Sequence, residues 1–172
     1  MNQKDIGKLF SFKFQYTDCE EIYSGYLIDF NKDWTLIKYN SADYVVDGYI
    51  ILKNKYVTAH KRDNQEKFTQ KILDLKGQKP TSKEKIPLTD LKTIFKYLSS
   101  KYGLFQFDMK TSKSCWIGKV KRITDSEMKI DYLTPKATWS TTMPPYKLGN
   151  IRTIRFNHDY LHSLLLIAKK KK

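Results

Sequence analysis

The chain has 172 residues and a formal net charge of +14, and 40% of its residues are hydrophobic and 14% aromatic. This apolar content can bury a core, which excludes a globally disordered chain, and the length suits one ordinary domain or two small ones. The sequence contains no run of about 18 apolar residues that would cross a membrane as a helix.

The N-terminal sequence and the cysteines indicate the cellular setting. The segment MNQKDIGKLF lacks the apolar core of a signal peptide, so we expect a cytoplasmic protein. Cys19 and Cys115 do not occupy equivalent places in the repeat described below. We therefore expect free thiols rather than a disulfide framework.

The charge is distributed unevenly along the chain. Residues 1–86 carry 15 Lys or Arg and 12 Asp or Glu, a net charge of +3, whereas residues 87–172 carry 17 and 6, a net charge of +11. A basic excess attracts polyanions and speeds encounters with them. The alternative is that the lysines serve only solubility.

The first half predicts five short strands and a closing helix. Four aromatic residues, Phe10, Phe12, Phe14 and Tyr16, alternate with polar residues, and a period of two is typical of a strand with one buried face. The turn residues Asn31 to Asp33 separate the next two strands. The remaining predicted elements are strands over 23–30, 35–39, 49–53 and 56–61 and a helix over 65–75.

A linker and a helix follow. Residues 77–85, GQKPTSKEK, are rich in linker residues and hold no large apolar group. Thr89 is the expected N-cap of a helix over 89–101, and Gly103 is placed to end it. The apolar face of this helix repeats at i, i+3, i+4 and i+7 and comprises Leu91, Ile94, Phe95 and Leu98. The predicted organisation is a first domain over 1–76, a linker over 77–87 and a second domain over 88–172.

The second half resembles the first. When Gly25 is set against Gly118, 28 positions align without a gap, and apolar residues match apolar residues. The matched pairs are Phe12 with Phe105, Leu27 with Val120, Phe30 with Ile123, Ile37 with Ile130 and Tyr39 with Tyr132. The glycine at the head of each long strand predicts a bend or bulge. Later strands over 146–148 and 151–156, a helix over 158–168 and a basic tail, Lys169 to Lys172, complete the second copy.

Together these elements predict a mainly β protein with short helices. Five short strands in each copy are few for an open sheet but suit a small closed barrel. The expected fold is therefore two tandem five-stranded small β-barrels joined by a linker and a helix. This pattern resembles small barrels of the Sm-like and SH3-like kinds.

The pattern resembles the Sm-like fold, a short helix followed by a strongly bent five-stranded antiparallel barrel. The family's first motif has a glycine followed by alternating apolar residues, and the matching residues here are Gly25, Leu27, Phe30, Leu36 and Ile37. In the family, an aspartate and an asparagine in the next turn contact RNA bases. These places fall on Asn31 and Thr35 in the first copy and on Thr124 and Met128 in the second.

The second family motif, an Arg-Gly or similar pair between the last two strands, falls on Lys53-Asn54 and on Leu148-Gly149-Asn150. The apolar frame thus resembles the family through most of both copies, whereas the RNA-reading residues are altered. Family members usually assemble into rings by pairing edge strands. The resemblance therefore implies edge pairing, either inside the tandem chain or in a ring of fewer chains.

No catalytic or cofactor motif is present, so we expect a binding protein without enzymatic activity and without a cofactor. His158 and His162 stand at i, i+4 on the predicted last helix, a spacing that can place two imidazoles on one metal. The sequence offers no evident third ligand, because Asp159 points elsewhere on that helix. We therefore expect no metal site.

Basic residues interleaved with aromatic residues in the second half form the candidate nucleic-acid site. The segment ATWSTTMPP predicts a loop that exposes its tryptophan for base stacking. The candidate residues are Lys119, Lys121, Arg122, Lys129, Trp139, Lys147, Arg152 and Arg155.

Two hypotheses follow from the sequence. In the first, the second barrel binds RNA or single-stranded DNA with little sequence preference, and affinity falls steeply with salt. In the second, the protein is an interaction or scaffolding module that assembles through barrel edges, as a homo-oligomer or with another chain, and its association is insensitive to salt.

Overall fold

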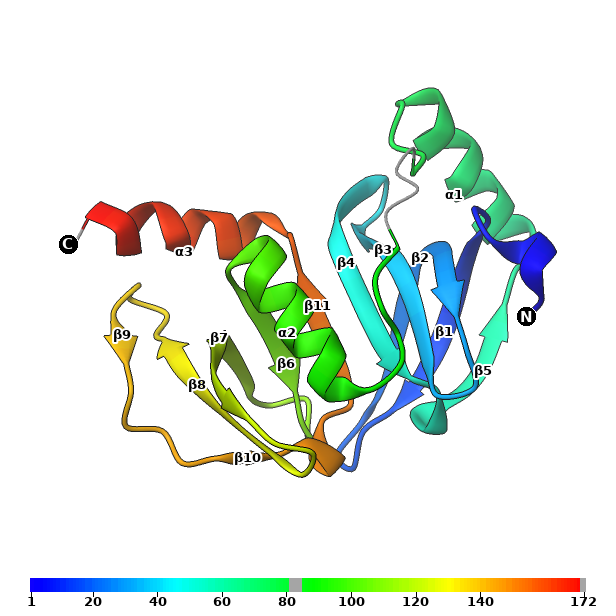
Figure 1. The fold of residues 1–172 in the computed structure, drawn as a ribbon. Helices are drawn as coiled ribbons and strands as arrows, with labels where there is room; N and C mark the ends of the chain where they lie inside the picture. Colours follow the sequence, from blue (N-terminus) through cyan, green and yellow to red (C-terminus); the bar gives the residue numbers. More distant parts are fainter. Residues whose placement is uncertain (81–84, 171–172) are drawn as a thin grey trace. The chain divides into compact units, whose positions relative to one another are not determined.

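The computed structural model describes residues 1–80 and 85–170, so part of the predicted linker and the end of the basic tail lie outside the described residues. The chain divides into two compact units, Met1–Glu84 and Lys85–Lys172, which are described separately (Figure 1). Both units are mainly β, and all of the strand pairs described below are antiparallel. The mainly β class predicted from the sequence is therefore confirmed.

Over residues 1–80, unit 1 contains five strands, two short 3-10 helices and one α-helix. The strands follow the order β4-β3-β2-β1-β5, and within the described residues β4 and β5 are not paired with each other, so the path does not close. The elements are η1 Gln3–Asp5, β1 Leu9–Gln15, β2 Glu20–Phe30, β3 Trp34–Ala42, β4 Val45–Lys53, η2 Asn54–Tyr56, β5 Val57–Lys61 and α1 Asn64–Leu75.

The alternating aromatic residues of β1 form the centre of this unit. Phe10, Phe12 and Phe14 are buried against apolar residues of β2, β3 and β4. The opposite face of the sheet carries a smaller cluster, in which Leu9 and Tyr26 pack against Leu73 of α1. Because side chains along β1 alternate between the two faces of the sheet, β1 contributes to a buried cluster on each face.

Unit 2 contains a comparable set of strands. Their order is β10-β8-β7-β6-β11, with β9 paired to β8, and β10 and β11 are not paired with each other within the described residues. The elements are α2 Leu91–Tyr102, β6 Phe105–Asp108, β7 Cys115–Ile123, β8 Glu127–Leu133, β9 Trp139–Ser140, β10 Tyr146–Lys147, η3 Leu148–Asn150, β11 Thr153–Phe156 and α3 Asp159–Lys170.

Helix α2 packs on β6 and β7 (Figure 1). Its Phe95 ring lies 4.8 Å from the ring of Phe105 and 5.9 Å from that of Phe107. The N-cap lies one residue later than the sequence suggested, because Asp90 rather than Thr89 accepts a hydrogen bond from the Thr93 N–H, and the helix starts at Leu91 rather than at residue 89. Gly103 ends the helix with φ of 75°, as expected for a C-terminal glycine.

Helix α3 packs against a different part of unit 2. Leu161, Leu164 and Ala168 join a buried cluster with Ile117 of β7 and Leu133 of β8. The face of the β7–β8 hairpin that carries Ile117 and Leu133 is therefore apolar near α3. Further along the same face, away from α3, the side chains are polar and exposed.

The two units share details of their central hairpins. Gly25 is opposite Tyr39, and Gly118 is opposite Tyr132. A Cβ atom at either glycine would overlap a backbone carbonyl oxygen of the facing strand. Each hairpin also has a register shift just beyond its glycine, between Leu27 and Asp29 in unit 1 and between Val120 and Arg122 in unit 2.

The first strands of the two units, β1 and β6, are not related by the ungapped alignment of the two sequence halves. Gly25 faces Phe10, whereas Gly118 faces Phe105, so Phe105 occupies the place of Phe10 rather than that of Phe12. A shift of two residues leaves every side chain on the same face, and the alternating pattern therefore cannot reveal it. The match of Phe12 with Phe105 is corrected accordingly.

Candidate nucleic-acid interface

Five of the predicted cations lie on one exposed face of unit 2, which we call the basic face. The strand register places Lys119 opposite Asp131, Arg122 opposite Lys129 and Lys147 opposite Glu127. Residues directly opposite each other share a face. The basic face therefore comprises Lys119, Lys121, Arg122, Lys129 and Lys147, all exposed, together with Asp131 and Glu127.

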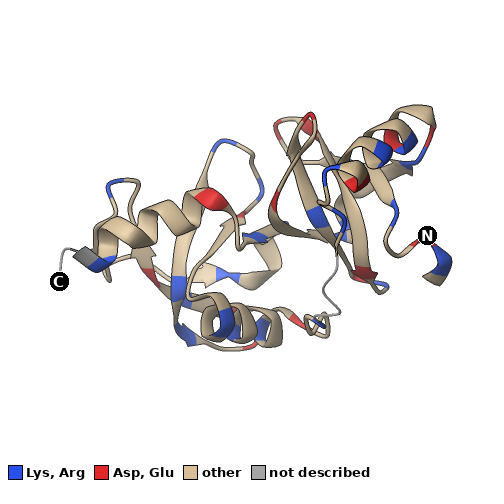
Figure 2. Cartoon of the chain, turned by 90° about the horizontal axis from the view of Figure 1, so that it is seen from above, with Lys and Arg blue, Asp and Glu red and all other residues tan. Residues whose placement is uncertain are grey.

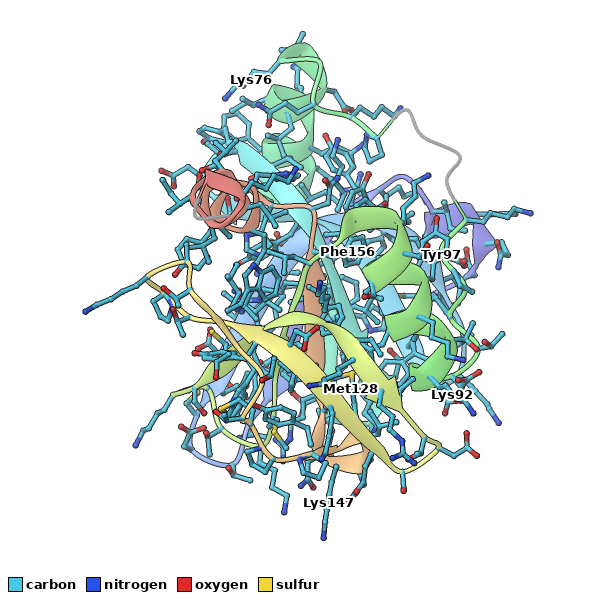
Figure 3. The ribbon with its side chains drawn as sticks, turned by 60° about the vertical axis from the view of Figure 1, so that its left-hand side comes forward. Lys76, Lys92, Tyr97, Met128, Lys147 and Phe156 are labelled. Carbon is cyan, nitrogen blue, oxygen red and sulfur yellow. The ribbon has the colours of Figure 1, made fainter. Side chains whose placement is uncertain are left out.

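The opposite face of the same strands is buried. Met128 and Ile130 point into the interior, where both are almost fully enclosed. In Figure 3 the Lys147 side chain projects outward, away from the body of the unit. Simple alternation along β8 thus separates an apolar interior from a charged exterior.

A β-bulge increases the charge on this face. The register of β7 shifts between Val120 and Arg122, so two consecutive residues, Lys121 and Arg122, reach the same side. The Lys121 Nζ lies 4.0 Å from the Asp131 Oδ1, and Arg122 is opposite Lys129, two residues before Asp131. Without the bulge, one of these two cations would point into the interior.

The two acids of the basic face do not neutralise it evenly. Asp131 lies between two lysines, with its carboxylate oxygens 3.9 Å from the Lys119 Nζ and 4.0 Å from the Lys121 Nζ. Arg122 and Lys129 have no carboxylate oxygen within 4 Å among the described residues. The positive charge is therefore less compensated at Arg122 and Lys129 than at Lys119 and Lys121. Figure 2 shows the Lys and Arg residues of the chain in blue and the Asp and Glu residues in red.

Trp139 does not occupy an exposed loop. It belongs to β9, pairs with Leu133 of β8, and is half-buried against the cluster beneath α3. The Lys119 Nζ lies 5.0 Å from the centre of its ring, a cation–π contact. A base could stack on this side of the ring only by displacing Lys119.

Arg152 and Arg155 lie outside the basic face. Arg152 is buried, with 7% of its surface exposed. Arg155 is half-buried, and its Nη2 lies 3.6 Å from the Oδ2 of Asp108 at the end of β6. The same carboxylate oxygen accepts a hydrogen bond from the Thr153 hydroxyl at 2.6 Å. We therefore remove both arginines from the candidate site, because Arg152 is buried inside the unit and Arg155 lies beside a carboxylate of the same chain.

The sequence did not indicate the depression beside Arg122 and Lys129. It has a volume of about 190 Å³, and Thr124, Glu127 and Pro145 complete its lining. Pro145 precedes β10, so the pairing of β10 with β8 brings it next to the hairpin. Only this long-range pairing, which is invisible to local pattern, could have revealed the depression.

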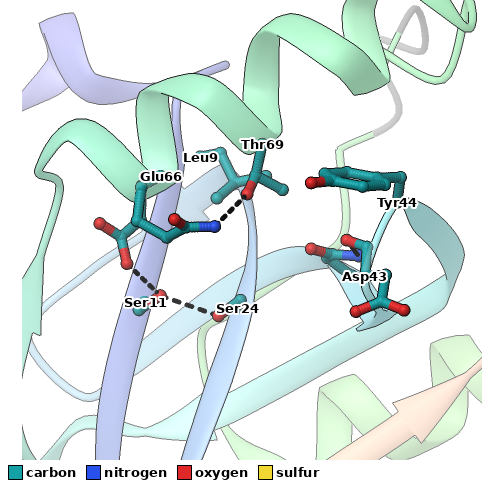
Figure 4. Close-up of a pocket in the computed structure, with 9 residues that line it drawn as sticks. Leu9, Ser11, Ser24, Asp43, Tyr44, Glu66 and Thr69 are labelled. Carbon is teal, nitrogen blue, oxygen red and sulfur yellow. Dashed lines mark hydrogen bonds between the residues drawn. The ribbon is translucent and has the colours of Figure 1, made fainter.

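Unit 1 has a separate polar pocket between α1 and the sheet, with a volume of about 250 Å³ (Figure 4). Its buried carboxylate, Glu66, accepts a hydrogen bond from the Ser11 hydroxyl at 2.7 Å, and Ser11 also contacts the Ser24 hydroxyl at 2.8 Å. The other Glu66 oxygen accepts from the Asp63 N–H at 3.0 Å, which completes a capping box. Glu66 thus caps the N-terminus of α1 and links this helix to β1 through the hydrogen bond from Ser11. Its role is structural.

His158, which precedes α3, and His162, which lies in α3, have other neighbours than metal ligands. His162 Nε2 lies 3.0 Å from the Asn157 Oδ1, and the His158 ring stacks on that of Tyr160. Across residues 1–80 and 85–170, no three side chains of His, Cys, Asp or Glu are grouped so that they could hold a metal ion.

Comparison with protein-family models gave no match, and comparison with curated proteins gave none either. Within the described residues, no helix has both the length and the apolar character needed to span a bilayer.

Proposed function

We propose that this protein binds single-stranded nucleic acid, RNA or DNA, through the basic face. The observation that supports the proposal is the gathering of five exposed cations on one face of the β7, β8 and β10 strands, against two acids. Cations arranged in this way neutralise successive phosphates and release their counterions, which is the main source of affinity for a nucleic-acid backbone.

The proposed binding has little sequence preference. Phosphate contacts position a nucleic acid but do not read its bases. The ring of Trp139, which adjoins the face, has Lys119 over it. The places where the Sm-like family reads RNA bases carry Thr124, whose hydroxyl accepts hydrogen bonds within its own turn, and Met128, which is buried.

We further propose that the two units are tandem copies of one small-barrel fold of the Sm-like kind. Several shared features support this: the order of the five main strands, the glycine and bulge of the central hairpin, the 3-10 helix before the last strand and the helix after it. An experimental structure in which the two hairpins superpose with Gly25 on Gly118 would support the duplication. Hairpins that superpose only in another register would contradict it.

Fluorescence anisotropy with labelled oligo-uridylate and oligo-adenylate tests the binding proposal. We expect similar affinities for the two oligonucleotides and a linear fall of log K with log salt concentration. A slope of at most about −3.5 corresponds to one phosphate contact for each of the five cations on a single strand, at about 0.7 each. The absence of binding at low salt would contradict the proposal, since attraction between a polyanion and a +14 protein is strongest there.

A second candidate function is assembly through a strand edge. The structure favours considering it because β5 ends the strand order of unit 1 and pairs only with β1 among the described strands of this unit. Four of its residues, Thr58 to Lys61, are exposed. Unpaired edges accept further strands. Light scattering over a range of protein and salt concentrations distinguishes this function, because strand pairing gives an oligomer that high salt does not dissociate.

A further inference from the structure

The β7–β8 hairpin holds two cations in an unfavourable arrangement. Arg122 and Lys129 are direct cross-strand partners on an exposed face. Like charges directly opposite each other destabilise an antiparallel pair. Neither head group has a carboxylate oxygen within 4 Å in the part of the chain that the structure describes. An anion bound between them would relieve the repulsion.

The space beside this pair suits a small anion. The depression of about 190 Å³ is lined by Arg122, Lys129, Thr124, Glu127 and Pro145. None of these side chains is aromatic, so the depression offers no ring on which a base could stack. Its lining, with two cations and no aromatic ring, fits a phosphate group better than a nucleobase.

The nearby acids have other cationic neighbours. Asp125, in the hairpin turn, forms an ion pair with Lys92 of α2, at 2.8 Å between Nζ and Oδ1. Glu127 lines the depression but stands directly opposite Lys147. The Asp125 carboxylate is thus paired with Lys92, and the depression itself holds two cations, Arg122 and Lys129, against one acid, Glu127.

The first unit lacks this arrangement. The same hairpin positions, counted from Gly25 and Gly118, are occupied there by Asp29 opposite Leu36. Leu36 is buried and Asp29 is acidic, so the first hairpin cannot hold an anion in this way. The cation pair is a feature of unit 2 alone and does not follow from the shared fold.

We infer that Arg122 and Lys129 form a seat for one backbone phosphate group of the nucleic acid, an inference that rests on the proposed function. The guanidinium of Arg122 can donate two parallel hydrogen bonds to phosphate oxygens, and Lys129 supplies a second charge from the neighbouring strand. The rest of the basic face then continues along the hairpin toward Lys119.

Titration with inorganic phosphate tests the seat directly. The full ¹⁵N-labelled chain is titrated with sodium phosphate replacing sodium chloride at constant ionic strength. We expect saturable shifts of the amide signals of Arg122, Thr124, Glu127 and Lys129, and the loss of these shifts in the variant R122Q/K129Q. The spectrum of the variant without phosphate shows whether its fold is retained. If these shifts are absent, or are equally large in the variant, Arg122 and Lys129 do not form the phosphate seat.

Binding to oligo-uridylate provides the second readout. We expect R122Q/K129Q to reduce the salt slope by about 0.7, since the seat holds one phosphate group and each single-strand phosphate contact contributes about 0.7. The matched control K67Q/K71Q removes the same charge from exposed positions of α1 and should keep the slope. R122K should also keep it, because the charge remains. An unchanged slope in R122Q/K129Q, or an equal fall in the control, would overturn the inference.

The two readouts separate the inference from the proposed function. Phosphate-dependent shifts without any binding of oligonucleotide would mean a bare anion site, which overturns both the proposed function and the nucleic-acid phosphate seat. Oligonucleotide binding without these shifts, and with an unchanged slope in R122Q/K129Q, would overturn the seat and leave the proposed function standing. Shifts combined with the reduced slope support both.

Discussion

Gly25 and Gly118 have the same steric reason to be glycine. Each lies in the long strand of its hairpin, where the facing carbonyl oxygen, of Lys38 or of Asp131, occupies the space of a side chain. An isoleucine of the same facing strand, Ile37 or Ile130, also contacts this space. The close approach of the two strands therefore requires a residue without Cβ.

Gly25→Ala and Gly118→Ala should each destabilise the fold by about 2 kcal/mol or more, because the new methyl group forces the strands apart. Gly149→Ala is the control, since a Cβ there meets no atom within 4 Å. Urea denaturation followed by circular dichroism measures all three variants. Equal stability of G25A, G118A and G149A would contradict this steric account.

At the scale of the element, α2 depends on its N-cap. The Asp90 carboxylate accepts hydrogen bonds from the backbone N–H and the hydroxyl of Thr93, at 2.9 and 2.8 Å. The bond from the Thr93 N–H, followed by that from its hydroxyl, lowers the pKa of Asp90 below its usual value. Thr89 only donates to Asp90, at 3.1 Å, and does not cap the helix itself.

Asp90→Ala should cost about 1 kcal/mol of stability near neutral pH, and Thr89→Ala clearly less. Because the pKa of Asp90 is lower in the folded state, its contribution is present above the unfolded value near 3.8 and is lost as the pH falls through the lowered value. Unfolding midpoints of wild type and D90A measured between neutral and strongly acidic pH should therefore converge in acid. A difference that persists unchanged in acid would contradict the assignment.

Helix α2 should also matter through Phe95, which is fully buried against Phe105 and Phe107. Phe95→Ala is expected to destabilise the fold by about 3–5 kcal/mol through cavity formation. Phe68→Ala on α1 is the control, since 53% of this side chain is exposed. Thermal or urea unfolding of both variants measures the contrast, and a small effect of F95A would show that α2 is not part of the core.

The sequence predicted the strands through alternation and α2 through its apolar stripe, because these patterns are local. It could not predict the two-residue offset at Phe105, since the period of two hides it. Nor could the sequence predict that Lys119 is exposed and Arg155 half-buried, because both residues lie on strands. Only the register of β7, β8 and β10 places Lys119 on an exposed face, and only the neighbouring Asp108 explains the half-buried Arg155.

At the scale of the whole molecule, the excess positive charge lies in the second half of the chain, as the counts of +3 and +11 show. The basic face concentrates part of that excess on three strands of unit 2. Charge of this kind acts through counterion release, so its contribution must appear in the salt dependence of binding and not only in affinity.

The most direct test of the nucleic-acid proposal compares two variants with equal loss of charge. The first, K119Q/K121Q/R122Q/K129Q/K147Q, neutralises the basic face, and the second, K4Q/K32Q/K67Q/K71Q/K79Q, removes five exposed lysines from unit 1. Binding of labelled oligo-uridylate is measured over a salt series. We predict that the first variant loses about 100-fold or more in affinity at low salt and most of its salt slope, while the second keeps the wild-type slope. Equal losses in the two variants would contradict a defined interface, because net charge alone would then explain the binding.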